Sequence, residues 1–330
     1  MKHKTFEDTI DFVNELLDKN NEWIDRYKTY IERYHKNIER YMEGKSKFQK
    51  GPFIVYTSLS NIIDKSTLRY DLRYKGQSVA TVSVIRDEVF VNTSRKSESN
   101  KRCFGIGTKL PTKTKWRSSK ADNFRSEFRS CKIKKGHSEE HLIESELLKE
   151  FSKTSSREKI ICNIQPVTIG SMFFQFATPL TASGYEINYS SHKGGGIDIL
   201  ARVKHSDNKT RICVMELKDQ NTGSEPPEKV ISQAIAYATF VARLLREDQG
   251  KVWYNIFGFS GDVPKELIID VVCIIPKDPR KPSVTFEGLR YEVCKDTYLE
   301  LHTLFFERND NPLIPYKFNF IGSLKDSLLK

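Results

Sequence analysis

The sequence predicts a mixed α/β (α+β) protein, and three patterns along the chain indicate this class. Apolar residues recur at three- and four-residue spacing from about 5 to 43, which is typical of a helix. Short alternating runs rich in β-branched and aromatic residues follow, from about 53 to 92. Helical and strand-like patterns then alternate after Gly136. We therefore expect three consecutive domains: an N-terminal amphipathic helix (1–50), a β-rich basic module (51–135) and an α/β domain with a C-terminal extension (136–330).

The N-terminal helix is predicted to end near Gly44 and Gly51-Pro52, because glycine and proline interrupt helices. Its apolar stripe includes Ile10, Val13 and Trp23. A stripe of this kind usually packs on its own chain. The alternative is a coil that pairs two copies of the chain, so a homodimer is also among the predicted partners.

The second domain begins with strand patterns at Phe53–Thr57, Thr67–Tyr74 and Ser78–Asn92. Turns are predicted at Lys75-Gly76 and Arg86-Asp87, between these runs. Together they predict a small antiparallel sheet.

The third domain is predicted from alternating helix and strand patterns. Helices are expected at Glu139–Lys153, Gly170–Thr178 and Glu228–Glu247. Strands are expected at Ile187–Tyr189, Gly196–Val203, Ile212–Leu217, Val252–Phe259, Leu267–Ile275 and Thr297–Glu307. This order predicts a mixed sheet with helices packed on it.

The basic charge of the chain is concentrated in one segment. The chain carries 54 Lys and Arg against 43 Asp and Glu, a net charge of +11. The segment Ser94–Lys135 alone holds fourteen basic and three acidic residues, so it accounts for the whole excess. Basic residues interleaved with aromatic ones are typical of surfaces that bind nucleic acid. The alternative is a basic loop whose aromatic rings pack within its own domain. We predict nucleic-acid contacts by Arg102, Lys113, Lys115, Trp116, Arg117, Lys120, Arg125 and Arg129.

Composition excludes several other classes of protein. Hydrophobic residues at 38% and aromatic residues at 11% are too many for a disordered chain. No apolar run approaches the roughly 20 residues of a membrane span, and the N-terminus lacks the apolar core of a secretory signal. The six cysteines contain no C-x-x-C pair, which disfavours a disulfide framework or a cysteine zinc site. We therefore expect a cytoplasmic protein without a membrane partner.

Two short motifs in the third domain place acidic and basic side chains on neighbouring strands. They are Gly194-Gly-Gly-Ile-Asp198 and Glu216-Leu217-Lys218. Side chains alternate between the two faces of a strand, so Glu216 and Lys218 project to the same side. Asp198 would lie across a hairpin from Glu216. Charged groups at the end of an apolar strand are costly to bury unless they are paired or bind a cation, and two carboxylates suit Mg²⁺.

These motifs resemble the PD-(D/E)XK nuclease superfamily, in which an aspartate begins one strand and (D/E)-X-K follows on the next. The proline that precedes the aspartate in the family is replaced by Ile197. The resemblance covers roughly residues 136–276 and implies a restriction-endonuclease-like fold. It also implies hydrolysis of phosphodiester bonds with Mg²⁺ or Mn²⁺, held by Asp198, Glu216 and the main-chain carbonyl of Leu217. Lys218 would orient or deprotonate the attacking water.

Two further matches to the family lie on helices. Glu144 shares a helix face with Leu148 and resembles the helix glutamate that reaches the metal or its water in many members; an ordinary acidic surface is the alternative, and Glu140 is a second candidate. Gln233 and Tyr237 are four residues apart and resemble the Q-x-x-x-Y element of recombination exonucleases. They would orient Lys218 or contact the substrate backbone, or else form a polar pair within the core.

The resemblance therefore implies a metal-dependent endonuclease or exonuclease, with DNA preferred over RNA as its substrate and defence or mobile-element processing as its context. One alternative is a nucleic-acid-binding protein that keeps the fold without cutting. Another is a structural subunit in which the same charges form buried ion pairs.

Overall fold

A computed structural model of the chain describes residues 5–48, 51–58, 67–131, 139–155, 157–158, 161, 163–183, 186–192, 194–219, 226–277, 286, 288–309 and 316–321. The chain divides into two compact units. Unit 1 comprises Met1–Lys28, Glu146–Val167 and Phe176–Lys330, and unit 2 comprises Thr29–Ser145 and Thr168–Gln175. Both mix helices and strands, so the predicted α/β class is confirmed. Among the described residues, no helix is both long and apolar enough to cross a bilayer.

The two units interleave along the sequence, whereas the sequence predicts three consecutive domains. The predicted boundary between residues 135 and 136 lies outside the described residues. The three-domain division therefore stays a prediction.

The N-terminal segment is helical as predicted, but it forms two helices rather than one. Thr5 begins the first with a capping box, in which Thr5 and Asp8 each accept a hydrogen bond from the other's backbone N–H. The break follows at Asn20, whose side-chain amide donates to the carbonyl of Leu16 at 2.7 Å and satisfies one of the acceptors left open at a helix end. The two helices are α1 (Phe6–Lys19) and α2 (Glu22–Ser46).

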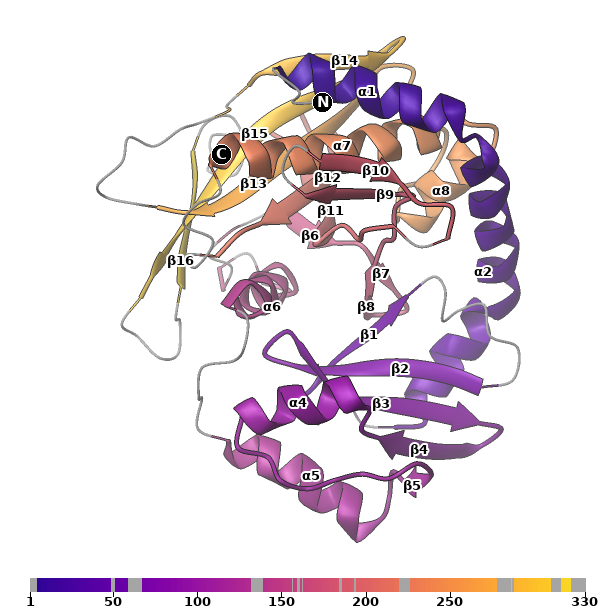
Figure 1. The fold of residues 1–330 in the computed structure, drawn as a ribbon, viewed down its shortest axis with the longest axis vertical. Helices are drawn as coiled ribbons and strands as arrows, with labels where there is room; N and C mark the ends of the chain where they lie inside the picture. The colour runs from indigo at the N-terminus through magenta and orange to yellow at the C-terminus, as the bar shows by residue number, and fades with distance from the viewer. Residues whose placement is uncertain are drawn as a thin grey trace. The chain divides into compact units, whose positions relative to one another are not determined.

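A seven-stranded mixed sheet forms the centre of unit 1 (Figure 1). Its order is β14-β15-β13-β12-β11-β6, and β16 pairs with β15. The strands are β6 (Ile164–Pro166), β11 (Ile199–Lys204), β12 (Thr210–Leu217), β13 (Leu267–Pro276), β14 (Arg290–Cys294), β15 (Thr297–Arg308) and β16 (Tyr316–Ile321). A separate two-stranded sheet contains β9 (Leu180–Ser183) and β10 (Glu186–Tyr189).

The connections within this sheet follow from its strand directions. β11 and β12 are antiparallel and form a hairpin, whereas β12, β13 and β15 run parallel. Parallel neighbours need a crossover connection. Between β12 and β13 this connection contains α7 (Pro227–Arg246) and α8 (Gly250–Ile256).

The core of unit 1 is built around α7, which packs on β12 and β13 and also contacts α1 (Figure 1). Most side chains of α7 are buried. Phe240 of this helix meets the rings of Trp23 and Tyr27, with centroids 5.4 Å and 4.9 Å away. Burial of such large apolar rings supplies much of the stability of a core. The first two turns of α2, up to Lys28, therefore belong to unit 1 and pack in its core.

Unit 2 contains a second seven-stranded sheet, in the order β5-β4-β3-β2-β1-β8-β7. Its antiparallel strands β2, β3 and β4 match the predicted sheet, and Lys75, Gly76 and Arg86 have positive φ at the predicted turns. At Gly76 a Cβ atom would lie 1.8 Å from the carbonyl oxygen of His141, so only glycine fits there. The elements are β1 (Ile54–Ser58), β2 (Thr67–Tyr74), β3 (Gln77–Ile85), β4 (Glu88–Asn92), α4 (Arg95–Cys103), β5 (Thr114–Lys115), α5 (Ser119–Ser130), β7 (Thr168–Ile169) and β8 (Met172–Gln175); α6 (Glu139–Phe151) begins in this unit.

Two predicted elements of the third domain are wrong. The predicted helix at 170–178 is a hairpin of β7 and β8, because Gly170 and Ser171 both adopt positive φ and form a tight turn between strands. The predicted strand at 252–259 contains α8, in which Trp253 and Ile256 are buried at helical spacing. Short apolar runs fit both periodicities, so only tertiary packing decides between them.

Candidate functional site

The β11–β12 hairpin brings Asp198 and Glu216 together. Its register pairs Ile199 with Met215, and Asp198 and Glu216 are the next residues along the two strands. The backbone N–H of Asp198 donates to Glu216 Oε1 at 3.4 Å, and the N–H of Leu217 donates to Asp198 Oδ2 at 3.0 Å. The two carboxyl groups also lie within hydrogen-bonding reach of each other. The two acidic residues of the motif are thus neighbours in space.

The environment of Glu216 disfavours its negative charge. Its side chain is only 1% exposed. The pKa of this carboxyl is raised well above its ordinary value, first by burial and second by the neighbouring Asp198 carboxylate, and the Lys218 ammonium partly opposes the rise. Two carboxyls in such contact favour sharing a proton or binding a cation. The pair therefore has the electrostatic character of a cation site.

Lys218 and Leu217 complete the motif at the end of β12. Lys218 is half-buried, and its backbone N–H donates to the carbonyl of Ile274 on β13 at 3.0 Å. Its ammonium lies close enough to Glu216 to lower that carboxyl's pKa. Leu217 is fully buried. The role of its carbonyl as a metal ligand stays a prediction.

Gln233 and Tyr237 on α7 form a polar pair beside the carboxylates. The Tyr237 hydroxyl accepts a hydrogen bond from the backbone N–H of Ala182 at 3.3 Å and lies within hydrogen-bonding reach of Gln233. Its pKa is raised to about 12, chiefly by burial and then by the charge of Glu216. These contacts are those of a polar pair within the core. The effect of Glu216 on the Tyr237 pKa indicates that the hydroxyl also lies near the carboxylates.

The glycines before Asp198 have a packing role. A Cβ atom at Gly194 would lie 2.3 Å from the carbonyl oxygen of Thr178, and one at Gly195 would lie 2.2 Å from the Tyr237 hydroxyl. Real Cβ atoms do not approach so closely. The glycines thus let the segment that leads into Asp198 lie against α7 and β9.

We expect Gly195→Ala to destabilise the protein by about 1–3 kcal/mol, because it inserts a methyl group into packed surroundings. Adding Tyr237→Phe should recover part of this loss, because the nearest atom is the hydroxyl oxygen and the next, Cζ, lies at 3.0 Å. Denaturant unfolding of both variants measures the effect. Gly107→Ala is the control, since no atom lies within 4 Å of its added Cβ. A Gly195→Ala variant as stable as this control would show that the close packing is wrong.

Glu144 has its described partners inside unit 2. It is 7% exposed, and Oε1 accepts a hydrogen bond from the Tyr56 hydroxyl at 3.2 Å. Oε1 also lies 3.8 Å from Arg73 Nη1, and Oε2 lies 3.5 Å from His141 Nδ1. Asp198 and Glu216 belong to unit 1. The role of Glu144 as a metal ligand, and that of Glu140 as its substitute, stay predictions.

The basic segment is divided between buried and exposed residues. Trp116 is 5% exposed and Arg125 is 8% exposed. The Arg125 guanidinium stacks over the Trp116 ring at 4.3 Å, donates to the Trp116 carbonyl at 2.8 Å and pairs with Asp122. The prediction that these two side chains bind nucleic acid is therefore corrected, because both are used in packing. The exposed members of the predicted set are Arg102, Lys113, Lys115, Arg117, Lys120 and Arg129.

The other aromatic residues of the basic segment are also buried. Phe104, Phe124 and Phe128 are at most 4% exposed, and they form edge-to-face contacts with one another. The structure confirms the alternative that these rings pack within their own domain. Stacking on bases is excluded for them by burial.

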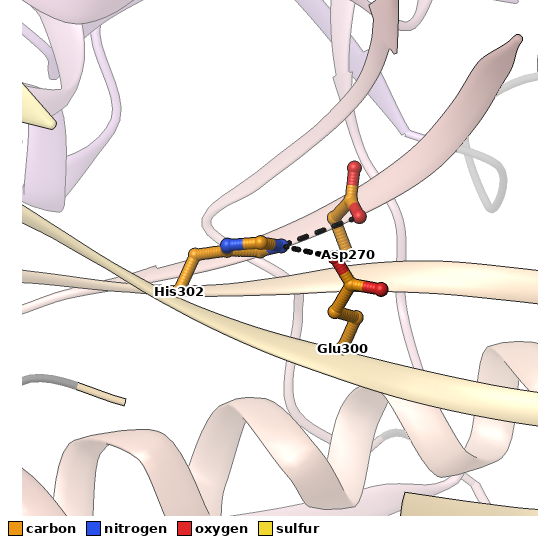
Figure 2. Close-up of side chains that lie close together, drawn as sticks. All are labelled: Asp270, Glu300 and His302. Atoms are coloured by element: carbon orange, nitrogen blue, oxygen red, sulfur yellow. Dashed lines mark ion pairs between the residues drawn. The ribbon is translucent and has the colours of Figure 1, made fainter. Parts of the chain in front are cut away.

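A second group of ionisable side chains lies within the sheet of unit 1, and its members are not among the site residues predicted from the sequence. Asp270 on β13 and Glu300 and His302 on β15 offer ligand atoms that all lie within 4.8 Å of one another (Figure 2). His302 Nε2 lies 3.4 Å from Asp270 Oδ1 and 3.6 Å from Glu300 Oε1. Two carboxylates and an imidazole could bind a metal ion, and several divalent ions accept such a donor set.

Cationic side chains already surround these carboxylates. Arg211 Nη1 lies 3.5 Å from Asp270 Oδ1 and 3.4 Å from Glu300 Oε2, and Arg290 Nη2 lies 2.7 Å from Glu300 Oε2. His205 Nε2 lies 2.7 Å from Asp270 Oδ2. Despite complete burial, the pKa of Asp270 is lowered to about 2, because hydrogen bonds and the charges of the two histidines outweigh desolvation. We call these six residues, of which Arg290 alone is exposed, the buried charge network.

The sequence carries one signal for this network. Asp270 is the single charged residue in the apolar strand Leu267–Pro276, and an isolated buried carboxylate requires a partner. The sequence does not show which residues are its partners. They are set by the parallel pairing of Cys213 with Asp270 and of Asp270 with Glu300, which joins strands that are distant in sequence.

Compared with models of protein families, with curated proteins and with solved structures, the chain has no match. The geometry of its own residues is therefore the basis for a functional proposal. The backbone N–H groups of Asp198 and Leu217 donate to the carboxyls of Glu216 and Asp198, whereas Arg211 and Arg290 pair with the network around Asp270.

Proposed function

We propose that this chain is a metal-dependent nuclease that hydrolyses phosphodiester bonds, with DNA as its preferred substrate. The observation that carries the proposal is the contact between the Asp198 and Glu216 carboxyls, with Lys218 immediately after the strand that carries Glu216. A buried carboxyl pair beside a lysine is costly for folding, because each carboxylate opposes the charge of the other. A site that binds a cation and activates water explains why the chain keeps all three.

The order of elements around the motif supports the proposed relation to the PD-(D/E)XK superfamily and its restriction-endonuclease-like fold. After α6, the sheet of unit 1 begins with β6, and β11 and β12 join it as antiparallel strands after β7–β10. The chain then passes through α7 and α8 to β13, which is parallel to β12. Asp198 immediately precedes β11, and Glu216 lies near the end of β12.

The donor chemistry of the carboxyl pair fits a hard divalent cation. Mg²⁺ typically takes one or two protein carboxylates, with water and substrate phosphate completing its shell. Asp198, Glu216 and the Leu217 carbonyl would hold Mg²⁺ or Mn²⁺. A bound ion would supply a Lewis acid that stabilises charge on the phosphate and on the leaving oxygen.

The remaining steps belong to side chains of this protein. Lys218 would orient the attacking water through its ammonium or, as the neutral amine, accept the proton of that water at Nζ, which is general-base catalysis. Tyr237 would act as a positioning residue, because with a pKa of about 12 its hydroxyl stays neutral and keeps its bond to the β9 backbone. Gln233 would hold that hydroxyl in place. Arg102, Lys113, Lys120 and other exposed cations of unit 2 would attract the nucleic-acid backbone.

Incubation of the purified protein with plasmid, linear duplex, single-stranded DNA and RNA tests the proposal. Each substrate is incubated with Mg²⁺, with Mn²⁺ and with chelator. We expect metal-dependent cleavage of at least one DNA substrate and none with chelator. Absence of cleavage under every condition would contradict the proposal, as would cleavage that Asp198→Asn leaves intact.

The metal requirement should depend on pH. Because the Glu216 pKa is raised, Glu216 keeps its proton at pH values where an ordinary glutamate is ionised, and metal binding must displace that proton. The Mg²⁺ concentration for half-maximal cleavage should therefore continue to fall as pH rises above the range in which an ordinary glutamate titrates, by up to about tenfold per pH unit. Calorimetric titration in two buffers of different ionisation enthalpy should detect proton release on binding. A metal requirement independent of pH, with no proton release, would contradict this electrostatic picture.

A further inference from the structure

Unit 2 contains a cationic pocket that is separate from the carboxyl pair. It has a volume of about 430 Å³ and lies between the end of α2 on one side and α5 with the segment that leads into it on the other. This volume is within the range of pockets that bind small organic ligands. Its lining residues are Ser46, Lys47, Phe48, Trp116, Arg117, Asp122, Arg125 and Arg129.

The charges of this pocket are only partly balanced. Lys47 lies 2.8 Å from Asp87 and 3.0 Å from Glu43, and Arg125 pairs with Asp122. Arg117 and Arg129 are exposed, and neither forms a hydrogen bond or an ion pair with any residue in the described part of the chain. Two guanidinium groups are therefore available to an anion from outside.

The floor of the pocket indicates which part of a ligand is recognised. Phe48 and Trp116 are 8% and 5% exposed and meet edge to face, with centroids 5.6 Å apart. The Arg125 guanidinium already covers one face of the Trp116 ring at 4.3 Å. The rings are thus not open to a stacked base. Recognition would depend on charge and hydrogen bonding, which arginine provides to phosphate in bidentate form.

We propose that this pocket binds a phosphate group of a nucleotide through Arg117 and Arg129, and that a nucleic-acid strand supplies it. The choice of a strand rests on the proposed nuclease function, while the phosphate chemistry rests on the pocket alone. The volume of about 430 Å³ exceeds that of one phosphate, so part of the attached nucleotide also fits. Because the rings are covered, the pocket binds without preference among bases.

Binding measurements in chelator test this inference independently of cleavage. A fluorescent single-stranded oligonucleotide is titrated with wild-type protein and with Arg117→Gln/Arg129→Gln. We expect the affinity of the double variant to fall by about tenfold or more, because each arginine gives a charge-assisted hydrogen bond. The matched control is Arg95→Gln/Lys96→Gln, which removes two exposed charges of the same segment outside the pocket. This control should lose less than threefold.

Competition identifies the source of the phosphate. Inorganic phosphate, a free nucleoside monophosphate and unlabelled oligonucleotides of different base composition are the competitors. The oligonucleotides should compete with equal strength, and the free nucleotide should compete only weakly. Strong competition by the free nucleotide would overturn the choice of a strand and leave a nucleotide pocket. Equal losses in the two double variants, or no binding of any phosphate probe, would overturn the pocket itself. Because chelator is present, either result leaves the proposed nuclease activity to its own assay.

Discussion

Lys218→Ala should reduce the rate of DNA cleavage by at least about a hundredfold, because a positioned acid or base typically contributes 10²–10⁴ to a rate. The side chain lies beside the carboxyl pair, where its charge lowers the pKa of Glu216. Its removal therefore takes away the group that orients or deprotonates the attacking water, and also a counter-charge to Glu216. Single-turnover cleavage at saturating Mg²⁺ measures the effect. Lys204→Ala is the matched control, since Lys204 lies at the opposite, exposed end of the same hairpin.

Asp198→Asn should lower the cleavage rate without lowering the stability of the protein. Cleavage should fall at least as far as in Lys218→Ala, because the pair loses a metal-binding carboxylate. The metal-free protein should unfold at the same temperature as wild type or higher, because the like charge that raises the Glu216 pKa is gone. Functional sites commonly show this opposition between activity and stability. A strongly destabilised Asp198→Asn protein would favour the alternative in which these charges form a structural ion-pair cluster.

The second large effect concerns the buried charge network. Asp270→Asn should cost about 3–5 kcal/mol in the free energy of unfolding, because removing one partner leaves other buried charges uncompensated. Arg211 and His205, at 3.5 Å and 2.7 Å from the carboxylate, would lose their shared acceptor. Denaturant unfolding monitors the loss. Asp207→Asn is the control, because Asp207 also approaches Arg211, at 4.0 Å, but its side chain is 43% exposed.

The same experiment distinguishes an ion-pair network from a metal site. Arg211 and Arg290 already neutralise Asp270 and Glu300, so wild-type protein should keep its stability after treatment with chelator. The loss caused by Asp270→Asn should also be the same with and without chelator. If chelator alone destabilises the wild type as much as the substitution does, the group of Asp270, Glu300 and His302 holds a metal ion instead.

Local patterns predict those parts of the structure that neighbouring residues determine. The β11–β12 hairpin follows from apolar runs separated by a short turn, and its pairing brings Asp198 to Glu216. The helices α1, α2 and α7 follow from apolar spacing. Only the break at Asn20, which depends on one side-chain hydrogen bond, is not visible in that spacing.

The remaining features depend on contacts that are distant in sequence. Residues 170–178 and 252–259 carry apolar runs whose conformation is decided by packing. Trp116 and its neighbours have the composition of a nucleic-acid surface, but burial against Phe48 and Arg125 gives them a different role. The buried charge network is assembled from strands paired in parallel, so no local motif marks its members together.

The central claim is that Asp198 and Glu216 form a metal site, and crystals soaked in Mn²⁺ test it most directly. The anomalous difference map should contain a peak for Mn²⁺ between the two carboxylates. Its distance to oxygens of both should be about 2.1 Å, as expected for a small, hard divalent ion. The peak should be absent from crystals of Asp198→Asn. A map without a peak at this pair, or with a peak only among Asp270, Glu300 and His302, would contradict the claim.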